Sequence, residues 1–188
     1  SCLSRKGAAA LRNGFRGSRL LLEEVLVVAI FANHAHVFPK EIWPEGTLDE
    51  LRKLMDTCHI EKVVAFAPFA DQVEQLGIEP NRWLAHELER FDNIYGFGTI
   101  DMNKKNPAKQ AEDIAKLGFK GIKLHPAYQK FNVIADELKD FYAAAEELGL
   151  FLVFHMGVHW YRIKEYHPLL CDELAHLYPR LKFSMEPV

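Results

Sequence analysis

The chain has 188 residues, of which 49% are hydrophobic and 26% charged, and its formal net charge is −3. This composition is typical of one globular domain with enough apolar residues for a core. No basic patch occurs beyond the first 20 residues, which argues against nucleic acid as a partner. No apolar run approaches the roughly 20 residues that cross a bilayer, so we expect no membrane partner. Three widely spaced cysteines form no Cys-x-x-Cys motif, which favours a reducing, cytoplasmic compartment.

Residues 1–24 differ from the rest of the chain. Five Arg and Lys residues precede the first acidic residue, Glu23. We interpret this segment first as a disordered leader or an artefact, and second as an organellar transit peptide, which an Arg-rich, acid-poor composition resembles. We therefore expect the folded domain to comprise residues 25–188.

Short apolar stretches alternate with amphipathic ones along that domain. Thr47, with Glu50 three positions later, forms a capping box that starts a helix. Asn81 and Asn106 are the predicted N-caps of the next two helices, and Gly149 is a predicted C-cap. The predicted strands are 25–32, 62–67, 94–100, 121–125, 151–155 and 181–185, and the predicted helices are 48–58, 81–90, 107–117, 138–148 and 168–178.

Six short strands with five crossover helices are typical of repeated βαβ units and a parallel sheet. Two α/β architectures compete: a doubly wound open sheet and a TIM-type (β/α)8 barrel. No Gly-x-Gly-x-x-Gly motif follows the first strand, which removes the main argument for a dinucleotide-binding sheet. Polar residues instead recur at strand ends, and in a barrel those ends surround one point. The sequence therefore favours a partial TIM-type barrel; the strand-end residues are His34, His36, Asp101, His125 and His155.

The pair His34 and His36 is the first candidate for chemistry. Side chains two apart on a strand point the same way, so the two imidazoles would face one point. Two unrelated polar residues in a loop are the alternative. With His155 they would supply three nitrogen ligands to a metal that keeps one position open for water. Such a metal lowers the pKa of its bound water to about 7.

Three segments then show a family resemblance. Residues 31–39 (FANHAHVFP), 118–126 (GFKGIKLHP) and 147–157 (ELGLFLVFHMG) resemble the strand-one, strand-four and strand-five motifs of the amidohydrolase superfamily, in its amidohydrolase 2 branch. That branch includes aminocarboxymuconate-semialdehyde decarboxylase and related hydrolases. The resemblance implies a divalent metal, zinc first and manganese, iron or cobalt as alternatives, held by His34, His36 and His155.

The implied function is hydrolysis or decarboxylation of a small carboxylate, amide, ester or lactone substrate through a metal-bound water. The family also uses a His after strand six and an Asp after strand eight, which this sequence lacks. We therefore expect a C-terminally incomplete barrel. Its exposed edges predict pairing with another chain, including a homo-oligomer. The competing hypothesis is a catalytically incomplete fragment that binds metal weakly or associates through those edges.

Further site residues are expected on the same face. Asp101 would orient a metal-bound histidine, and Glu186 would stand in near the metal. Lys123 is expected to be a charged residue of the barrel interior or to contact a substrate carboxylate, and His125 lines the site or makes a structural hydrogen bond. The predicted catalytic residues are His155, Asp101 and Glu186, and the predicted substrate-binding residues are Lys123, His125, His159, Trp160 and Phe38.

Overall fold

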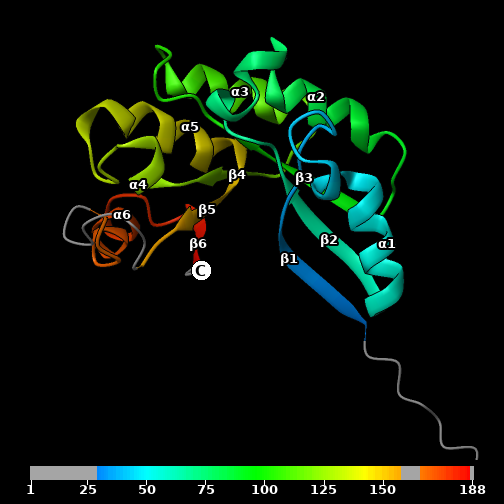
Figure 1. Ribbon diagram of the computed structural model, residues 1–188. Coiled ribbons are helices and arrows are strands. Elements are labelled where there is room, and N and C mark those ends of the chain that lie inside the picture. The colour runs from blue at the N-terminus through cyan, green and yellow to red at the C-terminus, as the bar shows by residue number, and fades with distance from the viewer. Residues whose placement is uncertain (1–28, 158–165, 187–188) are drawn as a thin grey trace, which may run out of the picture.

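The computed structural model describes residues 29–157 and 166–186 (Figure 1). Its strands form one sheet in the order β1-β2-β3-β4-β5-β6, and every neighbouring pair is parallel. The six-stranded partial barrel predicted from the sequence is therefore confirmed. The strands are β1 (Ile30–His36), β2 (Ile60–Phe66), β3 (Ile94–Thr99), β4 (Gly121–Leu124), β5 (Phe151–His155) and β6 (Lys182–Glu186).

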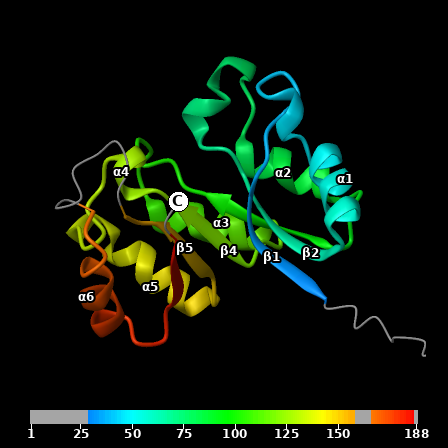
Figure 2. The same cartoon turned by 60° about the horizontal axis from the view of Figure 1, so that its bottom comes forward.

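The sheet is curled, and the helices lie on its convex side (Figures 1 and 2). Five helices are crossovers between consecutive strands, and the short α4 lies within the connection from β4 to α5. No described helix combines the length and the apolar character needed to cross a membrane. The helices are α1 (Leu48–Cys58), α2 (Pro80–Leu88), α3 (Pro107–Lys116), α4 (Pro126–Gln129), α5 (Lys139–Leu148) and α6 (Leu170–Leu177).

Three of the predicted helix caps are present. The Thr47 hydroxyl accepts the backbone N–H of Glu50 at 3.3 Å, and the Asn106 side chain accepts that of Lys109 at 3.0 Å. Gly149 ends α5 in the left-handed region, with φ of 67°. Each cap satisfies backbone groups that the helix itself leaves unpaired.

The predicted cap at Asn81 is wrong. Glu79 is the N-cap of α2 and accepts the backbone N–H groups of Asn81 and Arg82, because Pro80 occupies the first helical position. Asn81 is buried instead, and its amide exchanges two hydrogen bonds with the backbone of Thr99, at 2.9 and 2.8 Å. This pairing fixes the start of α2 against the end of β3.

The core has two layers that follow from the alternation of side chains along each strand. On β4, Ile122 and Leu124 belong to the large cluster beneath the helices, whereas Lys123 between them points to the concave side. A smaller apolar cluster occupies that concave side and comprises Val64, Phe66, Phe97 and Val153. The concave side therefore combines an apolar cluster with the charged side chain of Lys123.

The first strand runs further than predicted. The sequence suggested an end near Ala32, but β1 continues to His36, which lies opposite Phe66 of β2. A register shift occurs between Ala32 and Ala35, and His34 lies within this stretch. Residues 25–28 of the predicted strand lie outside the described residues.

Candidate metal site

The two histidines of β1 face each other. The Nε2 atoms of His34 and His36 lie 3.2 Å apart. Two nitrogens bound to one zinc at about 2.0–2.1 Å, with an angle of about 100° between them, are separated by about this distance. The pair therefore fits two neighbouring ligand positions around a single divalent cation.

Glu186 holds one of these rings from behind. Its carboxylate accepts a hydrogen bond from Nδ1 of His34 and others from the Asn33 amide and the Ser184 hydroxyl, both at 3.1 Å. With the proton of His34 on Nδ1, its Nε2 keeps a lone pair directed toward His36. A carboxylate behind a histidine is the usual way to orient a metal ligand. The sequence predicted Glu186 near the metal. In the structure its carboxylate contacts Nδ1 of His34, whereas it is Nε2 of that ring that faces His36.

Both rings are held in the neutral form that metal binding requires. Desolvation by the surrounding protein, and then the positive charge of Lys123, lower the pKa of His34. The same two causes, followed by His34 and His155, lower the pKa of His36 to about 4. At pH 7 both rings are therefore neutral, so each has one ring nitrogen with a free lone pair that can bind a metal.

The third predicted ligand lies nearby but does not join the pair. His155 ends β5, opposite Glu186 of β6, and its ring stacks on that of His125 with centroids 3.8 Å apart. His125 in turn caps α4, because its Nδ1 accepts the backbone N–H of Tyr128 at 3.2 Å. Among residues 29–157 and 166–186, no three His, Cys, Asp or Glu side chains converge as a complete metal site. The structure thus brings together two of the three predicted ligands.

Phe66 is the floor of this site, and sequence reasoning missed it. Its buried ring is met edge-on by His34 at 4.7 Å and by His36 at 5.2 Å, measured between ring centroids. The ammonium nitrogen of Lys123 lies 5.0 Å from the centroid of the same ring. The alternation of inward Val64 and Phe66 in the second strand was the available signal, but it does not say which ring lies beneath the histidines.

Lys123 carries a buried charge at the centre of the concave side. The residue is 0% exposed, and its Nζ is the one buried side-chain polar atom of the described residues that has no hydrogen-bond partner. Burial lowers the pKa of its ammonium to about 8, and the charge of Glu186 opposes that shift. An unpaired buried ammonium is costly, so this position is not explained by stability.

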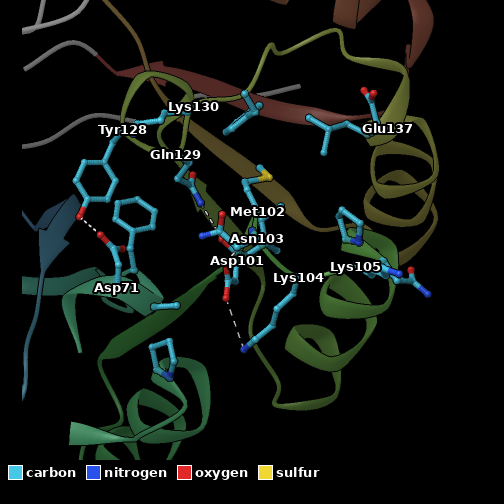
Figure 3. Close-up of a pocket in the computed structure, with 18 of the residues that line it drawn as sticks. Asp71, Asp101, Met102, Asn103, Lys104, Lys105, Tyr128, Gln129, Lys130 and Glu137 are labelled. Carbon is cyan, nitrogen blue, oxygen red and sulfur yellow. Dashed lines mark hydrogen bonds and ion pairs between the residues drawn. The ribbon is translucent and has the colours of Figure 1, made fainter. Parts of the chain in front are cut away.

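Asp101 lies in a different region. It lines a groove of about 1450 Å³ formed by the loops that follow β2, β3 and β4 (Figure 3). Its carboxylate lies 3.7 Å from the ammonium of Lys104 and accepts the backbone N–H of Asn103. Across the groove, the Tyr128 hydroxyl donates to Asp71. None of these contacts of Asp101 reaches the histidine pair, so its catalytic role stays a prediction.

Of the remaining predicted substrate contacts, the structure describes only Phe38. Phe38 follows β1 and packs on Trp43, with ring centroids 5.5 Å apart, in the loop before α1. His159 and Trp160 lie outside the described residues.

Comparisons with known proteins bear on the fold and the family. A solved 5-carboxyvanillate decarboxylase from Sphingomonas paucimobilis is 13% identical, with a TM-score of 0.64 over 84% of this chain and 67% of its own. A probable 2-pyrone-4,6-dicarboxylic acid hydrolase from Acinetobacter baumannii is 14% identical, with a TM-score of 0.57 over 85% of this chain and 58% of its own. A 5-carboxyvanillate decarboxylase from Novosphingobium aromaticivorans with bound manganese is 15% identical, with a TM-score of 0.63 over 84% and 65%.

These likenesses show the shared barrel fold, and the chain spans from 58% to 67% of the length of those three structures. No curated protein matches the sequence. The amidohydrolase family model matches residues 34–186, which begin at the first histidine of the pair and end at Glu186. The chain therefore belongs to the amidohydrolase family.

Proposed function

We propose that this chain provides the metal-binding part of an enzyme that hydrolyses or decarboxylates a small carboxylate, amide, ester or lactone substrate. The proposed ligands are His34, His36 and His155. The observation that carries the proposal is the facing pair of Nε2 atoms, 3.2 Å apart, with the other nitrogen of His34 hydrogen-bonded to Glu186. Family membership and the barrel's parallel strand ends support it.

The similar structures suggest the range of reactions. They are named as decarboxylases of an aromatic acid and as a hydrolase of a pyrone dicarboxylic acid, and one of them holds manganese. Imidazole nitrogens suit zinc, and manganese, iron or cobalt are alternatives. A bound divalent cation would supply a Lewis acid that stabilises negative charge on a substrate oxygen.

The described residues have separate tasks in this proposal. Glu186 holds the proton of His34 on Nδ1 and so keeps Nε2 available. Phe66 closes the site from below and keeps water away from that side of the histidine pair. His125 stacks on His155 and restricts its ring orientation. His159, Trp160 and Phe38 remain predicted substrate contacts.

Metal binding is the first test. We expect the purified chain to bind Zn²⁺ or Mn²⁺ at close to one equivalent, measured by calorimetric titration and by metal analysis after dialysis. Separate His34→Ala, His36→Ala and His155→Ala substitutions should each weaken binding by at least tenfold. His86→Ala is the matched control, because that ring lies exposed on α2, 3.8 Å from Glu89. Unchanged metal affinity in the first three variants would refute the ligand assignment.

Turnover is the second test. Release of CO₂ from 5-carboxyvanillate and ring opening of 2-pyrone-4,6-dicarboxylate, both followed by absorbance, represent the two reaction types. Metal-dependent turnover of either compound that is lost in His34→Ala supports the proposal. Weak metal binding with no turnover of either would favour the competing hypothesis of a catalytically incomplete fragment. The association that this hypothesis includes would use β1 and β6, each of which pairs with one strand within the described sheet.

A further inference from the structure

The buried ammonium of Lys123 has more donors than the protein uses. An ammonium carries three N–H groups. Its Nζ has no hydrogen-bond partner in the described part of the chain, and the Phe66 ring, 5.0 Å away, covers it from one direction. Buried polar groups in folded proteins are nearly always hydrogen-bonded. An ammonium that is buried without an acceptor among residues 29–157 and 166–186 points to an acceptor that these residues do not supply, such as a ligand.

Glu186 is not a hydrogen-bond acceptor for the ammonium of Lys123. Glu186 interacts with Lys123 through charge. Its oxygens are occupied by three other donors, which belong to His34, Asn33 and Ser184. Glu186 therefore holds His34 and makes no hydrogen bond to the ammonium of Lys123.

We propose that Lys123 is a specificity-determining residue that binds a carboxylate group of the ligand on the concave side of the sheet, beside the histidine pair. The role of that carboxylate as part of a substrate rests on the proposed function, whereas the anion site itself does not. Through this contact Lys123 would select a ligand with a carboxylate over an uncharged amide or ester of the same shape.

The surroundings of Lys123 favour an anion over a neutral group. Its neighbours across β4 are Thr99 of β3 and Val153 of β5, and Phe66 lies against the ammonium. Beside the apolar Val153 and Phe66, a charge–charge contact is stronger than in water. The titratable groups that interact with the ammonium are Glu186, His34 and His36. The lysine stem has four rotatable methylenes, so the ammonium can turn toward a small anion that arrives from the concave side. A neutral amide offers a carbonyl oxygen but no charge, so its contact with the ammonium contributes much less binding free energy.

The test uses acetate as the probe and acetamide as its uncharged isostere. Binding is measured by saturation-transfer NMR and by the shift of the thermal midpoint, with sodium chloride at equal ionic strength as the third arm. The full chain is examined after EDTA treatment, where no cation can bind the probe, and again after loading with Zn²⁺. The variants are Lys123→Met and, as the matched control, Lys120→Met, since Lys120 is exposed just before β4.

We expect the EDTA-treated chain and Lys120→Met to bind acetate at least tenfold more tightly than acetamide or chloride. Lys123→Met should lose that preference and still bind Zn²⁺, at least as tightly as the wild type, because it removes a positive charge that acts on His34 and His36. Equal binding of acetate to Lys123→Met, or equal binding of acetate and acetamide to the wild type, would overturn the proposal. A wild-type chain that does not bind Zn²⁺ would refute the proposed function. The acetate measurement in EDTA would still decide whether Lys123 binds an anion.

Discussion

Replacement of Lys123 by Met should stabilise the protein at neutral pH. The residue is 0% exposed, so solvent does not screen its charge. Burial lowers the pKa of its ammonium from 10.5 to about 8, which corresponds to a cost to folding of about 3 kcal/mol at pH 7. Met has a similar length and volume, so the replacement leaves little cavity. We therefore expect Lys123→Met to raise the free energy of unfolding by about 3 kcal/mol.

The dependence on pH separates this cause from better packing. The pKa of Lys123 is lower in the folded than in the unfolded chain, so the unfolded chain binds more protons between about pH 8 and 10.5. The stability of the wild type relative to Lys123→Met must then rise through that window. Urea unfolding at pH 7, 9 and 10.5 should show the advantage of the variant shrinking toward zero, with Lys120→Met as the exposed control. A variant that is less stable at pH 7, or an advantage that does not change with pH, would refute the reasoning.

Further predictions concern the histidine pair and its floor. Glu186→Ala should weaken Zn²⁺ binding by about 10–100-fold in a calorimetric titration, because His34 loses the group that fixes its proton; unchanged affinity would mean that Glu186 does not orient the ring. In NMR titrations of the metal-free chain, His36 should change protonation near pH 4, and a midpoint near 6.5 would contradict its lowered pKa. Phe66→Ala should cost about 3–5 kcal/mol in urea unfolding, because the ring is fully buried, whereas Phe31→Ala, at a side chain that is 57% exposed, should cost about 0.5 kcal/mol or less.

The parallel sheet and its polar edge could be predicted because they follow from local patterns. Short apolar runs separated by amphipathic helices specify crossover units, and parallel strands place their carboxyl ends together. The facing of His34 and His36 follows from their spacing of two residues, and the structure shows it. The caps at Thr47 and Asn106 were predictable for the same reason, since each interacts within three residues of itself.

Contacts between distant segments could not be predicted. Glu186 meets His34 across 152 residues, and no periodicity indicates which carboxylate will lie behind which ring. Asn is a residue type that favours N-caps, but Pro80 takes the first helical position and Glu79 becomes the cap. The Asn81 amide therefore bonds the backbone of Thr99. The stacking of His155 on His125 likewise depends on how β4 and β5 lie in register.

The two charges on the concave side show why this arrangement is better explained by function than by stability. The buried Lys123 and the half-buried Glu186 would favour folding most if they paired directly, because each would satisfy the other. Here Glu186 accepts hydrogen bonds from His34, Asn33 and Ser184, and within the described part of the chain Lys123 has an aromatic ring beside it and no acceptor. The carboxylate therefore holds Nδ1 of His34, and no described residue uses the hydrogen-bonding capacity of the ammonium. Met or Leu at position 123 would avoid the cost of a buried ammonium, so the lysine there is better explained by the proposed binding of an anion than by stability.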